Sequence, residues 1–127
     1  MSSRRQARRT ALILLYQWDL TGQPLGSLYL EEIDPFALEL ARPVVESAPA
    51  LDARITEAAE GWTADRLGTV ERNVLRLAIA ELDQGERPRE VVIAEAVALA
   101  KRYASPDAAR LVNGILGRIA RELEAAR

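Results

Sequence analysis

Apolar residues recur three and four positions apart along most of this chain, and this repeat limits its fold more than any other feature. Such spacing places side chains on one face of a helix, whereas a strand would need strict alternation. Composition agrees, because 22 Ala and 18 Leu stand against three Tyr and one Phe. We therefore predict an all-α fold, a compact bundle of six to seven helices.

Local signals place the ends of these helices. Asp34 before Pro35, and Ser105 before Pro106, are typical of an N-cap followed by the first helical position. Two glycines inside the last helix, Gly114 and Gly117, predict close approach by another helix. The predicted helices cover residues 4–20, 34–48, 49–60, 69–84, 88–103 and 105–123, with a short turn capped by Thr63 and the longer helix after it capped by Thr69.

Several functions are disfavoured by what the 127 residues lack. There is no Cys and no His, so disulfides, thiolate catalysis, histidine acid–base chemistry and common zinc sites are excluded. No phosphate loop or nucleophile elbow is present, and we expect neither an enzyme nor a bound cofactor. No apolar run approaches the roughly 20 residues of a membrane span, and we expect a cytoplasmic protein.

The first helix carries the clearest candidate for binding. Residues 1–20 hold four Arg and one Asp, while the remaining residues are net acidic. At about 100° per residue, Ala7, Ala11, Leu14, Leu15 and Trp18 form the expected buried face. Arg5, Arg9, Leu12 and Tyr16 form a separate stripe, bordered by Arg4 and Arg8. Guanidinium groups suit phosphates and an aromatic ring suits an unpaired base, so the stripe favours single-stranded RNA. A solvated helix end is the alternative.

A second anion site is conceivable at the start of the last helix. Helix N-termini attract phosphate, and Lys101, Arg102 and Arg110 lie nearby in the sequence. Plain capping fully explains Ser105 and Pro106 and is the better interpretation of this segment taken alone. The carboxylate of Asp107 would repel a phosphate but could accept hydrogen bonds from a base.

Four stretches together resemble the NusB family of bacterial transcription antitermination factors. They are "ARRTALILLYQWDL" (7–20), "VERNVLRLAIAEL" (70–82), "VVIAEAVALAKRY" (91–103) and "LVNGILGRIARE" (111–122). The resemblance implies one domain over residues 1–127, with helical subdomains of about 1–61 and 62–127. It also implies binding of boxA RNA from ribosomal RNA leader transcripts, together with the ribosomal protein NusE, in an antitermination complex on RNA polymerase.

The resemblance also assigns residues. It places Arg4, Arg5, Arg8 and Arg9 on RNA phosphates, with Tyr16, Asp107, Arg110 and Asn113 at the RNA surface. It places the protein partner on the central helices, with Glu71, Arg72, Arg76 and Glu81 as candidates. Leu111 replaces the family's Phe and removes one stacking ring.

One alternative of a different class stays open. A helical protein–protein adaptor could use the basic first helix to meet an acidic partner without specific RNA binding. Tyr16 in register with Arg5 and Arg9 favours RNA, because an adaptor has no need of a ring there. The sequence leaves a homodimer, the RNA preference and the RNA affinity undecided.

Overall fold

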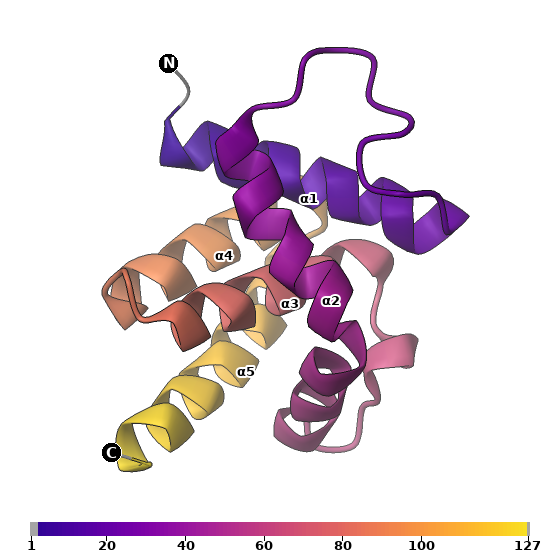
Figure 1. Ribbon diagram of the computed structural model, residues 1–127. Helices are drawn as coiled ribbons and strands as arrows, with labels where there is room; N and C mark the ends of the chain where they lie inside the picture. Colours follow the sequence, from indigo (N-terminus) through magenta and orange to yellow (C-terminus); the bar gives the residue numbers. More distant parts are fainter. Residues whose placement is uncertain (1–2, 127) are drawn as a thin grey trace.

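The computed structural model describes residues 3–126, and all its regular elements in that range are helices joined by turns and loops (Figure 1). Its elements are α1 (Arg4–Thr21), α2 (Pro35–Ala58), the 3-10 helix η1 (Ala64–Arg66), α3 (Thr69–Gln84), α4 (Arg89–Tyr103) and α5 (Pro106–Ala125). The all-α prediction is confirmed. The described residues form five α-helices, slightly fewer than the six to seven expected, and η1 adds one short 3-10 turn.

The difference in number lies in α2. We expected one helix over 34–48 and another over 49–60, but α2 runs through Pro43 and Pro49 as one kinked helix. Ser47 alone has non-helical backbone angles, with φ −120° and ψ 16°. Proline lacks the N–H that an unbroken helix would use, so the chain bends two residues before Pro49 and then continues.

The helix ends follow local chemistry. The Asp34 carboxylate accepts a hydrogen bond from Phe36 N at 3.0 Å, and Ser105 Oγ accepts one from Ala108 N at 3.0 Å, as expected. Thr69 is not the cap of α3. That position belongs to Gly68, whose N–H donates to Glu71 Oε2 at 2.7 Å. Thr63 lies at the N-cap of η1 as expected, but its side chain makes no capping hydrogen bond.

α3 is the central helix of the fold. It packs against α1, α2, α4 and α5, and residues 73–82 are all buried. The core is one continuous apolar cluster contributed by all five α-helices. α1 lies across one end of the molecule, and α4 and α5 form an antiparallel pair that packs against α3 (Figure 1). Within residues 3–126, no helix is both long and apolar enough to cross a bilayer.

Candidate nucleic-acid interface

Of the four arginine side chains that open α1, three point outward and one points into the protein. The side chain of Arg5 is 78% exposed, and those of Arg4 and Arg9 are half-buried. The Arg4 guanidinium lies 4.7 Å from the centre of the Phe36 ring, a cation–π contact that holds it against α2. Three positive charges thus lie along the outer side of one helix end.

Arg8 points into the protein, which corrects its expected place on the RNA. It is only 5% exposed, and its Nε donates to both carboxylate oxygens of Glu81 on α3, at 3.0 and 3.1 Å. Leu12, expected on the same outer stripe, is also buried. Both lie at the border of the polar stripe, where the neighbouring helix α3 decides which way they face.

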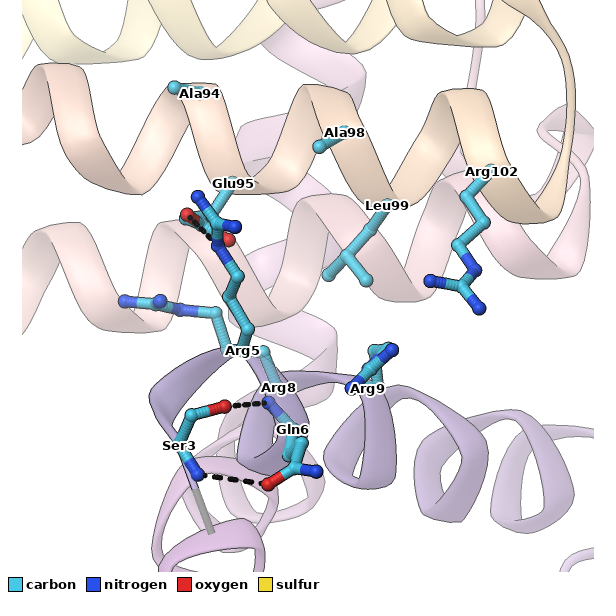
Figure 2. A pocket seen from close by; sticks show the side chains of 10 residues that line it. All are labelled: Ser3, Arg5, Gln6, Arg8, Arg9, Ala94, Glu95, Ala98, Leu99 and Arg102. Atoms are coloured by element: carbon cyan, nitrogen blue, oxygen red, sulfur yellow. Dashed lines mark hydrogen bonds and ion pairs between the residues drawn. The ribbon is translucent and has the colours of Figure 1, made fainter.

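A cleft of about 730 Å³ separates the first turns of α1 from α4 (Figure 2). At one end Arg5 Nε donates to Glu95 Oε1 across the cleft at 3.1 Å. Towards the other end Arg9 on α1 and Arg102 on α4 extend into the gap, and Leu99 lies between the two ends (Figure 2). The cleft can therefore hold an anion and a flat apolar group side by side.

Two tyrosines lie near this basic surface. Tyr16 is 39% exposed, as its place on the outer stripe predicts, but it is not among the residues that line the cleft. Tyr103 follows the same apolar repeat of α4 as the buried Val92 and Leu99, but it does not lie in the core. It is 40% exposed, it borders a hollow beside Arg9, and the Arg102 guanidinium lies 5.4 Å from its ring centre. The adjacent Lys101 and Arg102 were the signal in the sequence that could have identified it.

The start of α5 presents a second polar surface. Asp107 and Arg110 form an ion pair one turn apart with both side chains largely exposed, and Asn113 is also exposed. An exposed pair of this kind contributes little to stability, so either group is free to exchange partners. The expected close helix approach at the glycines is wrong, because a Cβ at Gly114 would meet nothing within 4 Å.

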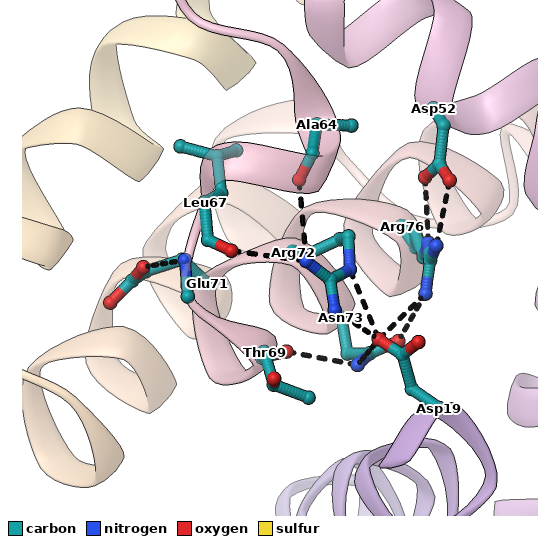
Figure 3. A network of polar contacts seen from close by, with 10 residues as sticks. Asp19, Asp52, Ala64, Leu67, Thr69, Glu71, Arg72, Asn73 and Arg76 are labelled. Atoms are coloured by element: carbon teal, nitrogen blue, oxygen red, sulfur yellow. Dashed lines mark hydrogen bonds and ion pairs between the residues drawn. The ribbon is translucent and has the colours of Figure 1, made fainter.

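A largely buried polar network joins Asp19, near the C-terminal end of α1, to side chains of α2 and α3 (Figure 3). Asp19 Oδ2 accepts hydrogen bonds from Arg72 Nη2 at 2.8 Å, Asn73 Nδ2 at 2.9 Å and Arg76 Nη1 at 3.1 Å. Arg76 also forms a two-pronged pair with Asp52, at 2.7 Å for each bond. Arg72 donates in addition to the backbone carbonyl of Leu67, which fixes the segment after η1.

The charges of this network are matched. Burial raises the pKa of the Asp19 carboxyl, but the hydrogen bonds from Arg72 and Asn73 and the charge of Arg76 outweigh burial, so its pKa lies below the usual 3.8. Burial acts to lower the pKa of Arg76, and the carboxylates of Asp52 and Asp19 reverse that effect, so its pKa is raised. Asp19 and Arg76 therefore stay charged in the folded protein at neutral pH.

Most of the residues that were expected on the partner surface are buried or bonded within the fold. Arg76 and Glu81 are buried, and Arg72 is bonded to Asp19 and to backbone carbonyls. Glu71 is half-buried and caps its own helix. Their charges looked like surface features in the sequence, but each has a partner within the fold because α3 is enclosed by its neighbours.

Comparison with known proteins gives a consistent result. The model of the NusB family matches residues 5–121. The transcription antitermination protein NusB of Solibacter usitatus is 40% identical over 134 residues, which cover 97% of this chain and 92% of that protein.

Solved structures agree with the sequence matches. NusB of T. maritima superposes with a TM-score of 0.84 at 37% identity, covering 95% of this chain and 92% of that one. A chain from the crystal structure of NusB and NusE in complex with double-stranded RNA superposes with a TM-score of 0.82 at 35% identity, covering 94% and 96%.

Proposed function

The chain belongs to the NusB family, and from this premise we propose that it binds boxA RNA of ribosomal RNA leader transcripts together with the ribosomal protein NusE. The family comprises antitermination factors rather than enzymes. The observation that carries the proposal is the basic outer side of α1, where Arg5 stays 78% exposed in spite of its bond to Glu95 and Arg9 has no ion pair with any described residue. A similar chain has been solved with NusE and RNA, which supports both partners.

In this proposal Arg4, Arg5 and Arg9 contact phosphates. A guanidinium remains charged and donates two parallel hydrogen bonds to a phosphate, so these contacts supply affinity without sequence preference. Arg8 is left out because its charge is taken by Glu81. Tyr16 contributes a stacking face for an unpaired base.

The start of α5 completes the proposed RNA surface. Arg110 supplies positive charge, while Asn113 and Asp107 offer hydrogen bonds to base edges. All three are exposed, which is compatible with this role.

The wider setting follows from the family. The protein would act in the bacterial cytoplasm, in an antitermination complex on RNA polymerase, with NusE docking outside the buried network around Arg76. The two helical subdomains implied by the sequence, about 1–61 and 62–127, would act as one body, since their apolar residues share one core. A homodimer would compete with these partners if it covered α1.

The test is fluorescence anisotropy of a labelled boxA-type RNA and a scrambled control, with and without NusE. We expect preference for boxA, strengthened by NusE, and a steep fall in affinity with salt because bound phosphates release counterions. Equal binding of both RNAs in the presence of NusE would refute the proposal and favour the adaptor.

Variants locate the contact. We expect Arg9→Ala to weaken boxA and scrambled RNA by the same factor, and to reduce the salt slope by about one. Tyr16→Ala should in addition erode the preference for single strands over duplex. Arg66→Ala is the matched control, because it removes an exposed arginine on η1. If both α1 variants bound RNA as the parent does, the proposed surface would be wrong.

A further inference from the structure

One carboxylate lies among the arginines of the cleft between α1 and α4. Glu95 projects from α4 and accepts a hydrogen bond from Arg5 Nε through Oε1 (Figure 2). Its side chain is 20% exposed, whereas that of Arg5 is 78% exposed. A polyanion-binding cleft gains nothing from an anion, since a carboxylate repels phosphate, so Glu95 calls for an explanation.

The two ends of the cleft differ in charge. Arg9 and Arg102 face the gap from opposite helices, and neither has a carboxylate partner among residues 3–126. At the other end Glu95 Oε2 accepts no hydrogen bond from any described residue. Leu99 and Ala98 line the wall between the two ends with apolar surface. The order across the cleft is thus two cations, an apolar wall and a carboxylate.

A nucleotide has the same order of groups. Its phosphate suits the paired guanidinium groups, its planar base suits an apolar wall, and the edge of the base offers hydrogen-bond donors. Phosphate is repelled from the carboxylate end, so that end must meet the donors of the base edge. The hydrogen bond from Arg5 Nε leaves Glu95 with lone pairs on both oxygens, because a carboxylate has about four acceptor positions.

The four bases differ in how well they fit two carboxylate oxygens. On its Watson–Crick edge guanine presents two adjacent donors, N1–H and N2–H. Adenine and cytosine each present one amino donor beside an acceptor nitrogen, and uracil presents one N–H between two carbonyl oxygens. An acceptor directed at a carboxylate is repelled, so guanine is the best match.

We propose that this cleft binds a guanine nucleotide of single-stranded RNA, with the guanine N1–H and N2–H donating to Glu95 and its phosphate held by Arg9 and Arg102. This proposal rests on the proposed RNA-binding function and adds a specificity-determining residue to it. Arg5 is then a positioning residue for the carboxylate, while its terminal nitrogens remain available to a neighbouring phosphate.

The test uses labelled 12-mer oligouridylates with the full-length protein. One carries a single central guanosine, one carries inosine there, which lacks only the N2 amino group, and one is all uridine. We expect the guanosine oligomer to bind roughly 10- to 100-fold more tightly than the inosine one, the range of a single hydrogen bond to a charged group. Glu95→Gln should remove this difference, because the amide presents a donor to the N2 position.

Glu90→Gln is the matched control, since it removes an exposed carboxylate from the same helix and should leave the preference intact. Equal binding of the guanosine and inosine oligomers by the parent would overturn the proposal without any variant. A Glu95→Gln variant that binds all three oligomers more tightly by one factor would also overturn it, and would make Glu95 a counter-ion only. Failure of the parent to bind boxA RNA as well would overturn the proposed function itself.

Discussion

Arg8→Ala is expected to destabilise the fold strongly. Arg8 and Glu81 are 5% and 6% exposed and are joined by hydrogen bonds of 3.0 and 3.1 Å. Removing one partner leaves the other charge buried without compensation, which costs about 3–5 kcal/mol. Because a domain of this kind has about 5–15 kcal/mol of total stability, the variant should lose about a fifth or more of its free energy of unfolding.

The assay is urea denaturation of parent and variant, followed by far-ultraviolet circular dichroism. The double variant Arg8→Met, Glu81→Leu is the matched control, because it replaces both charges by apolar groups of similar size. We expect it to regain most of the stability, since such replacements are often neutral or better. It should also bind RNA as the parent does, because Arg8 is not among the proposed phosphate contacts.

Two results would refute this reasoning. If Arg8→Ala unfolded within about 1 kcal/mol of the parent, Arg8 would not be held in the interior in solution, and its expected role on RNA would return. If the double variant were stable but bound RNA poorly, Arg8 would contribute to RNA binding in spite of its pair with Glu81.

Three further predictions concern stability. Leu116→Ala should cost about 2–5 kcal/mol in a denaturant melt, because Leu116 is fully buried; unchanged stability would contradict its place in the core. Ser105→Ala should cost about 0.5–2 kcal/mol by losing the cap on Ala108 N, with Ser27→Ala in an exposed loop as the control. Because the pKa of Asp19 is lower in the folded than in the unfolded protein, its charge adds stability above the unfolded pKa, and this stability is lost as pH falls through the folded pKa. The free energy of unfolding of Asp19→Asn should therefore fall less steeply with acid than that of the parent, and an unchanged dependence on pH would refute this.

The sequence predicted most helix starts because those signals are local. Asp34 with Pro35, and Ser105 with Pro106, act within one turn of their own chain. The same holds for the buried stripe of α1, where Ala7, Ala11, Leu14 and Leu15 are buried as predicted and Trp18 is half-buried against the core. These features depend on helix periodicity and on hydrogen bonds between near neighbours, which need no knowledge of the rest of the fold.

Residues at the edge of a stripe were predicted less well. Arg8 and Leu12 were expected outside and lie inside, whereas Tyr103 continues the apolar repeat of α4 and is nevertheless exposed. An angle of about 100° per residue gives the direction of a side chain but not what stands opposite it. For Arg8 the deciding neighbour is Glu81, 73 positions away in the chain.

The candidate site, too, was only partly predictable from the sequence. The arginine-rich stripe of α1 was evident from the sequence, and its role on RNA stays a prediction. The second wall of the cleft, with Glu95 and Arg102, comes from α4, and the Arg5–Glu95 hydrogen bond spans 90 positions. Neither α1 nor α4 contains a local sequence pattern that predicts this pairing.

The sequence by itself determined the helical class, most helix starts and the basic character of α1, because helix propensity, capping and charge belong to neighbouring residues in the chain. Only the tertiary structure decided which charges are available. Enclosure of α3 by four helices turns Arg76 and Glu81 into internal partners, while the packing of α1 beside α4 leaves Arg9 and Arg102 facing an open cleft. The physical reason is that burial and pairing of a charge depend on distant segments meeting in space.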